Sequence, residues 1–295
     1  MNQTKLLNKT MTKTHIRTLL SAAALTLPLA ALAEGDSPWL PIPGELSLTL
    51  NHTEQSASDA YIGDTQLPLS AITGGAASKY RRSTTQLRVG YGLSDSVSLD
   101  ATLGYGKVKV GAADSDSGLI DSVFGVNWRV LDEFERPALP TLTLRGAAII
   151  KGSYDGGRLA ALGNDQNGFE LAVLLGKQIT PALGLWAEVG VQHRSGGVPN
   201  ASFVDLGARY RFAPAWSASL GYSSKQYGGD LDIGGPGFAP ARFQEVRAER
   251  GVSKLGVGYA FAGNQGLALN LARVVSGRNT VKDNQVIGLS YTYAF

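Results

Sequence analysis

His193 and Ser195 are the two residues whose types and spacing could support nucleophilic catalysis. They lie two positions apart, so both side chains would point to the same face of an extended strand. A histidine can take the proton of a serine hydroxyl when a third residue orients its ring. Asn200 or Glu188 could take that third role only by stretching the usual spacing. Because two glycines follow the serine, we interpret the segment as a polar strand end entering a turn, with a hydrolase site as the alternative.

Metal and cofactor chemistry has little support in the residue types. The chain has no cysteine and three histidines. His15 lies in the signal peptide predicted below for residues 1–33. Only His52 and His193, which are far apart in sequence, are therefore expected in the exported protein. This argues against a transition-metal site. Aspartates also gather in polar segments, which we interpret as solvated loop tips rather than calcium ligands: Asp114, Asp116, Asp155, Asp230 and Asp232. We therefore expect no metal and no cofactor.

A larger set of charged residues occupies alternate positions inside otherwise apolar segments. If the bulky residues between them face a nonpolar environment, the charged ones line an interior. The candidates for this lumen lining are Arg88, Asp100, Asp121, Arg129, Arg145, Glu170, Glu188, Asp205, Arg209 and Lys254. Mixed charge inside a protein has two interpretations, a wetted passage for a solute or paired charges that fill the space.

The element that would position these residues is clearest at the C-terminus, in residues 286–295. Ile287, Leu289, Tyr291, Tyr293 and Phe295 occupy every second position, and small or polar residues fill the gaps. A period of two predicts a strand with one bulky face. A chain that ends on an aromatic residue of such a strand is typical of a bacterial outer-membrane barrel.

The same alternation recurs in pairs of segments along the chain, which predicts about twelve antiparallel strands. Short turns join the two members of each pair, at 93–96, 132–140, 180–182, 213–215 and 263–265. Longer polar connections join the pairs, at 54–79, 107–118, 152–167, 226–248 and 275–284. Short turns at one end and long loops at the other are typical of the periplasmic and extracellular ends of a transmembrane β-barrel.

The N-terminus carries an export signal. Four basic residues precede an apolar run over residues 19–32, which closes with Ala31-Leu32-Ala33. This arrangement predicts a signal peptide over residues 1–33, a short periplasmic or plug-like arm over 34–44 and a barrel over 45–295. Removal of the signal peptide takes away four of the 27 basic residues, so the mature chain would carry 23 basic and 24 acidic residues. A nearly neutral chain argues against nucleic-acid binding.

Three stretches carry a resemblance to a known family: Gly92–Leu99, Gly118–Glu133 and Lys151–Asp155. The hairpin Gly176–Leu185 is similar to later repeats of that family. On these residues the chain resembles the outer-membrane proteins associated with the meta-cleavage pathway of phenol degradation. The resemblance implies an outer-membrane transporter, and it supplies no catalytic or binding residues.

We therefore expect an outer-membrane β-barrel without enzymatic activity that passes or binds small hydrophobic or aromatic solutes. One alternative is a structural or surface-interaction barrel with a filled lumen, and another is an outer-membrane lipid hydrolase that uses His193 and Ser195. The expected partners are outer-membrane lipid, lipopolysaccharide and a small-molecule solute. Phe295 is expected to be read by the barrel assembly machinery.

Overall fold

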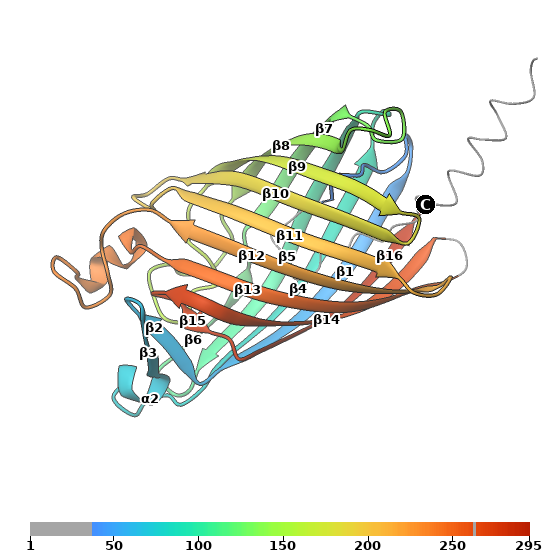
Figure 1. Ribbon diagram of the computed structural model, residues 1–295. Coiled ribbons are helices and arrows are strands. Elements are labelled where there is room, and N and C mark those ends of the chain that lie inside the picture. Colours follow the sequence, from blue (N-terminus) through green and yellow to red (C-terminus); the bar gives the residue numbers. More distant parts are fainter. Residues whose placement is uncertain (1–36, 262–263) are drawn as a thin grey trace, which may run out of the picture.

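The computed structural model describes residues 37–261 and 264–295, so the predicted signal peptide over 1–33 lies outside the described residues. Twelve antiparallel strands form a closed barrel (Figure 1). The strands are β1 (Leu46–Ala57), β4 (Tyr80–Gly92), β5 (Val97–Val110), β7 (Ser122–Leu131), β8 (Thr141–Ile150), β9 (Gly168–Thr180), β10 (Leu183–Arg194), β11 (Ala201–Arg211), β12 (Trp216–Tyr227), β13 (Glu249–Ala260), β14 (Gln265–Arg278) and β16 (Gln285–Ala294). The prediction of an all-β barrel of about twelve strands is confirmed.

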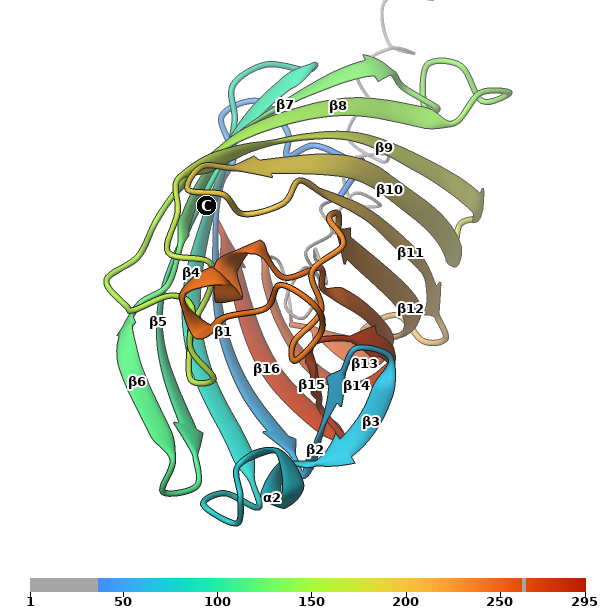
Figure 2. The ribbon, with the colours of Figure 1, turned by 90° about the vertical axis from the view of Figure 1, so that its left-hand side faces the viewer.

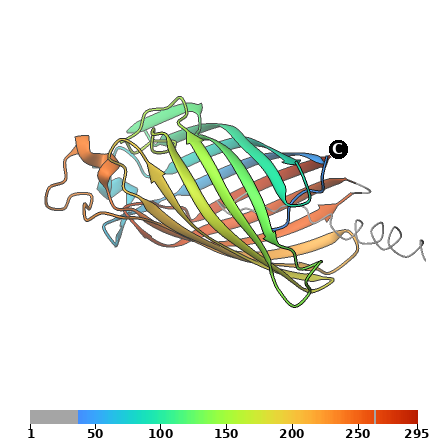
Figure 3. The same cartoon turned by 90° about the horizontal axis from the view of Figure 1, so that it is seen from above.

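The barrel closes through its N- and C-terminal strands. Among the twelve barrel strands, each strand from β5 onward pairs with the next one along the chain, up to β16. β1 pairs with both β16 and β4. The pairing between β4 and β5 completes the ring. The strands run diagonally to the long axis of the molecule (Figure 3). Closure pairs the backbone groups that a free edge strand would expose, which a sheet in lipid requires.

The bulky face of each strand points outward. On β16, Ile287, Leu289 and Tyr291 are exposed, whereas Ser290 and Thr292 are buried. The same alternation follows every barrel strand, so the outer wall is a belt of exposed apolar side chains. Such a belt is stable only against lipid. None of the described helices is long and apolar enough to cross a membrane.

The two ends of the barrel differ as the loop lengths predict. The short turns and the C-terminus lie at one end, and the long connections lie at the other (Figure 1). The long connections contain β2 (Asp59–Ile62), β3 (Thr65–Pro68), α2 (Leu69–Ile72), η1 (Pro240–Glu245) and β15 (Val281–Lys282). By the usual orientation of such barrels, the long-loop end is extracellular.

One predicted loop is wrong. Residues 107–118 form the end of β5, a three-residue turn and most of β6 (Asp114–Leu119), which pairs with β5 from Tyr105 to Val110. Serine, aspartate and glycine make up most of β6, so it lacks the apolar alternation that marks a strand. Backbone pairing with the long strand β5 stabilises it instead.

Candidate functional site

Residues 151–167, which connect β8 to β9, fold into the extracellular half of the lumen, and we call them the inward segment. Tyr154, Ala160 and Leu162 are buried against the inner face of the wall, in a cluster that includes Val108 and Ile120. The Arg82 guanidinium of β4 donates a hydrogen bond to the Leu162 carbonyl oxygen at 2.9 Å. The segment therefore covers the inner face of β4 and β5 and narrows the lumen.

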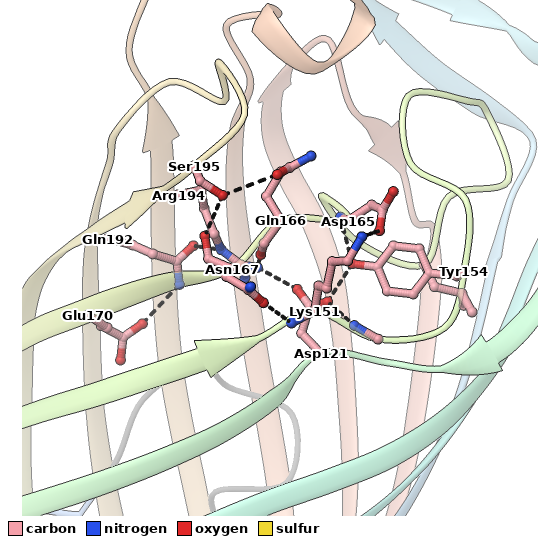
Figure 4. Close-up of polar contacts among 12 residues, drawn as sticks. Asp121, Lys151, Tyr154, Asp165, Gln166, Asn167, Glu170, Gln192, Arg194 and Ser195 are labelled. Atoms are coloured by element: carbon pink, nitrogen blue, oxygen red, sulfur yellow. Dashed lines mark hydrogen bonds and ion pairs between the residues drawn. The ribbon is translucent and has the colours of Figure 1, made fainter.

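Asp121, in the break between β6 and β7, is the hub that holds the inward segment (Figure 4). Its Oδ1 accepts hydrogen bonds from the Tyr154 hydroxyl at 2.5 Å and the Gly152 backbone N–H at 3.1 Å. Its Oδ2 contacts Arg194 Nη1 of β10 at 2.6 Å. The Tyr154 oxygen in turn accepts the Asp165 backbone N–H at 2.9 Å. The Asp121 carboxylate therefore connects the barrel wall to the beginning of the inward segment directly, and to its end through the Tyr154 hydroxyl.

The environment of Tyr154 favours its neutral form. Burial raises the pKa of this phenol well above its ordinary value, and the hydrogen bond to the Asp121 carboxylate raises it further. A neutral phenol can donate its proton to the carboxylate, whereas a phenolate would repel it. The contact between Tyr154 and Asp121 is therefore a stable latch at neutral pH.

A chain of charged groups runs along the inner wall of the barrel from β4 to β9. At its centre Arg145 of β8 contacts Asp100 of β5 at 2.5 Å, and we call this contact the central ion pair. Asn127 also donates to Asp100, at 2.8 Å, and the Arg88 guanidinium lies 3.6 Å from the same carboxylate. Glu170 extends the chain, 3.7 Å from Arg145 Nε.

Gly125 of β7 makes room for the central ion pair. A Cβ atom at this position would overlap both Arg145 and Asp100. The glycine lies between β5 and β8, in register with Asp100 on one side and Ala147 on the other. The central ion pair therefore joins β5 to β8 across β7, at a position of β7 that has no side chain.

A second charged cluster lies on β10, β11 and β13. Asp205 accepts a hydrogen bond from the Lys254 ammonium group, and its Oδ1 lies 3.4 Å from the Trp186 indole nitrogen. Glu188, beside Asp205 in the β10–β11 register, is almost fully buried. Arg209 of β11 is half-buried. Within this cluster Asp205 and Lys254 form an ion pair.

A cavity of about 550 Å³ occupies the lumen. Four of the predicted lining residues border it, namely Arg88, Asp121, Arg145 and Glu170. The remaining candidates, which do not border this cavity, are Asp100, Arg129, Glu188, Asp205, Arg209 and Lys254. Arg129 lies at the short-turn end, where it pairs with Asp132 at 3.1 Å.

Several residues that border the cavity were absent from the predicted lining. They include the inward polar row of β1 and basic residues at the extracellular ends of β4 and β13, namely Thr49, Asn51, Thr53, Gln55, Arg82 and Arg250. The alternation of β1 marks the first four, because its exposed partners are Leu50 and His52. Apolar groups interrupt the polar lining at Ile149, Leu162 and Val286.

The N-terminal arm enters the opposite end of the barrel. Pro38 is almost fully buried, and its carbonyl oxygen accepts a hydrogen bond from Thr143 Oγ1 at 2.7 Å. The Trp39 indole N–H donates to Glu133 Oε1 at 2.8 Å. Since Thr143 is itself fully buried on the inner wall, residues 38 and 39 lie inside the barrel. The arm thus narrows the lumen at the short-turn end.

Residues 228–248 lie across part of the extracellular mouth (Figure 2). Asp232 in this connection accepts hydrogen bonds from Arg278 Nε at 2.8 Å and Asn279 Nδ2 at 2.7 Å. Both bonds lower the pKa of the Asp232 carboxyl below its ordinary value, the arginine bond most strongly. Asp114 also forms an ion pair, with Arg158. These two aspartates are therefore loop anchors and not the solvated tips that the sequence predicts.

The arrangement of His193 and Ser195 differs from that of a nucleophile and its base. His193 Nδ1 lies 2.7 Å from Asn200 Oδ1, the candidate orienting residue. The Ser195 hydroxyl, however, donates to Gln166 Oε1 at 3.1 Å and contacts the Asn167 carbonyl oxygen at 3.3 Å. Among the described residues the serine thus bonds to the inward segment and not to the histidine.

Comparison with known proteins decides the family. The model of one family matches residues 56–291, and its description is "Putative MetA-pathway of phenol degradation". The chain belongs to this family. No curated protein matches the sequence. The match covers the barrel from the end of β1 to β16.

Solved structures of outer-membrane channels share the fold of this family member. An outer-membrane channel from Pseudomonas putida F1 matches 90% of this chain and 100% of its own, with a TM-score of 0.71 at 18% identity. The NanC porin matches 83% of this chain and 98% of its own, with a TM-score of 0.51 at 10% identity. The closed barrel with its apolar belt is located in the outer membrane.

Proposed function

We propose that the protein is a channel that passes small solutes with an aromatic or other apolar body through the outer membrane. The observation that carries this proposal is the lumen cavity of about 550 Å³. That volume lies in the range of small-molecule sites, which extends from about 300 to 1,000 Å³. The family description names phenol degradation, which supports this class of solute, and the chain shares its fold with a bacterial outer-membrane channel.

The lining of the cavity suits a solute that is apolar in its body and polar at one edge. Ile149, Leu162 and Val286 offer apolar contact, while Gln192 and Arg194 offer hydrogen-bond donors. A phenol presents an aromatic ring to the first group and a hydroxyl to the second. We propose that the remaining predicted lining residues act by holding the wall in shape.

Planar-bilayer recordings test this proposal. Wild-type protein should conduct, and phenol added to the bath should interrupt the current more often than cyclohexanol. Val286→Phe would fill part of the cavity, because this residue points inward and is 4% exposed. Ile287→Phe is the matched control, since its side chain faces outward. We expect Val286→Phe to reduce both the conductance and the interruptions, and the control to change neither.

The filled-lumen barrel predicts the opposite result. The apolar cluster under the inward segment and the central ion pair both occupy lumen space, which favours that alternative. Wild-type protein that inserts into the bilayer without conductance or solute flux would refute the channel and support the structural barrel. The same recordings therefore separate the two functions.

We further propose that the protein is not an enzyme. The Ser195 hydroxyl is engaged by Gln166, and this contact supports a structural role for the His193–Ser195 pair. Phospholipid hydrolysis by the purified protein should stay at the level of empty micelles, and Ser195→Ala should leave it unchanged. Hydrolysis that disappears in Ser195→Ala would establish the lipid hydrolase instead.

The expected partners remain proposals. The aromatic side chain of Phe295 is 66% exposed, and its backbone N–H donates to the Leu46 carbonyl oxygen at 2.8 Å. This position leaves the ring available to the barrel assembly machinery during insertion. Outer-membrane lipid is the proposed partner of the exposed apolar belt.

A further inference from the structure

Three cations form a cluster on the outer wall at the extracellular end of β4 and β5. Arg81 and Lys109 lie directly opposite each other in the β4–β5 register, and Lys107 follows on the same face of β5. All three side chains are exposed, whereas the intervening Val108 is buried toward the lumen. We call Arg81, Lys107 and Lys109 the outer cationic cluster.

The cluster has no carboxylate partner of its own. Within residues 37–261 and 264–295, none of its three members forms a salt bridge. The acids of the neighbouring strand β6 have other partners: Asp114 forms an ion pair with Arg158, and Asp116, which borders the groove beside the cluster, accepts a hydrogen bond from the Asp155 backbone N–H at 3.1 Å. Glu54 of β1 borders the same surface, and its carboxylate contacts His52 at 3.1 Å.

Like charges directly opposite each other on neighbouring strands are unfavourable, with Cβ atoms only about 5 Å apart. Arg81 and Lys109 adopt this arrangement, with Lys107 two residues away. A bound anion between them would turn the repulsion into attraction. The cluster therefore has the electrostatic character of an anion site.

A shallow groove of about 520 Å³ runs beside the cluster. Ser83, Ser115 and Ser117 border it together with four cationic residues, the three of the cluster and Arg82, and two acidic ones, Glu54 and Asp116. Cationic and hydroxyl donors in one groove are the groups that bind phosphate oxygens. The donors of the groove therefore suit a phosphate group.

The residues below the groove decide which phosphate would bind. Leu103, Tyr105 and Leu119 follow on the same outer face toward the membrane and are exposed by 46%, 44% and 58%. Lys107 Nζ lies 6.0 Å from the centre of the Tyr105 ring, so the basic and apolar surfaces are continuous. A ligand that fits both carries a phosphate above its acyl chains.

We propose that the outer cationic cluster binds a phosphate group of lipid A, with acyl chains of that lipid against Leu103, Tyr105 and Leu119. The extracellular end of an outer-membrane barrel lies in the leaflet that holds lipopolysaccharide. A cation near a membrane surface attracts anionic lipid headgroups. The site is on the outer wall and does not depend on whether the lumen conducts.

Native mass spectrometry of the purified protein in detergent micelles would measure the binding, with bis-phosphorylated lipid A as the probe. The test variant is Lys107→Gln/Lys109→Gln. The control variant is Arg136→Gln/Arg273→Gln, which removes the same charge from two exposed arginines elsewhere on the molecule. We expect the test variant to bind about thirtyfold more weakly, from two lost lysine–headgroup attractions. The control should bind within about twofold of the wild type.

Two further arms identify the ligand. Dephosphorylated lipid A should bind the wild type as weakly as bis-phosphorylated lipid A binds the test variant. Inorganic phosphate at millimolar concentration should not displace the bound lipid, because it lacks acyl chains. Equal binding by the test and control variants, equal binding of the dephosphorylated lipid, or displacement by inorganic phosphate would each overturn the proposal. A heat-modifiable band on electrophoresis would verify that both variants are folded barrels.

Discussion

The Tyr154–Asp121 latch offers the most direct test of how the lumen is narrowed. Tyr154→Phe removes only the hydroxyl that donates to Asp121 at 2.5 Å and accepts from the Asp165 backbone at 2.9 Å. The ring stays and can keep its contacts in the buried cluster. Asp121 also keeps its contact with Arg194. The substitution therefore isolates the hydrogen bonds from the packing.

The size of the effect follows from the charge of the acceptor. A hydrogen bond to a charged group contributes about 1.5–3 kcal/mol in proteins. The lower value suits a lumen that water can enter, and ~1.5 kcal/mol changes an equilibrium roughly tenfold. If the inward segment leaves the lumen for about 1% of the time in the wild type, we expect about 10% in the variant.

The latch also has a defined pH dependence. Because the pKa of Tyr154 is raised in the inserted state, the released segment loses the phenol proton first, near its ordinary value of 10.0. The latch is therefore complete below pH 10 and weakens as the pH rises above that value. Wild-type protein should visit its open level more often at pH 11 than at pH 8. Tyr154→Phe should lack this difference.

Single-channel recording measures both effects as the fraction of time spent at the higher conductance level. Tyr105→Phe is the matched control, because the same hydroxyl is removed from a tyrosine on the outer wall that is 44% exposed. The control should behave as the wild type at both pH values. A Tyr154→Phe channel with unchanged level occupancy and an unchanged pH response would refute the idea that this hydroxyl holds the segment in place.

Two further predictions concern the wall and the mouth. Gly125→Ala would press a methyl group against the central ion pair and should lower the free energy of unfolding by about 1–3 kcal/mol in denaturant titrations. Gly146→Ala, whose new Cβ would meet a side chain only at an ordinary distance of 3.7 Å, should cost much less; equal losses would contradict the steric argument. The hydrogen bonds from Arg278 and Asn279 lower the pKa of the Asp232 carboxyl, so these contacts are fully formed at any pH above its ordinary pKa of 3.8. They are lost only when the pH falls through the lowered pKa. Asp232→Asn should therefore exchange the amide hydrogens of residues 228–248 faster than the wild type at pH 6, whereas Asp230→Asn should exchange them at the wild-type rate. Exchange in Asp232→Asn as slow as in the wild type would exclude this anchor.

The barrel strands were predictable because their signal is local. Each strand alternates bulky and small or polar residues, as β16 does from Ile287 to Tyr293. The alternation arises from the period of an extended backbone, so neighbouring residues alone reveal it. β6 was missed for the same reason, since serine and aspartate at 114–117 offer no apolar face.

The candidate site was predictable only in part. Strand alternation identified which charged residues point inward, and Arg145 and Glu170 do border the cavity. It does not specify depth along the barrel, so Arg129 at the short-turn end was grouped with them. Depth depends on the stagger between strands, which backbone pairing across the whole sheet determines.

The sequence by itself determined the barrel strands, their outer apolar face and the location of the two ends, because each of these depends on residues close together in the chain. Only the tertiary structure decided how much of the lumen is filled. Tyr154 and Leu162 lie in a glycine-rich connection without periodicity, and their contacts with Asp121 and Arg82 are 33 and 80 residues away. Whether such a segment folds inward depends on the shape and charge of a wall that exists only after the strands have closed.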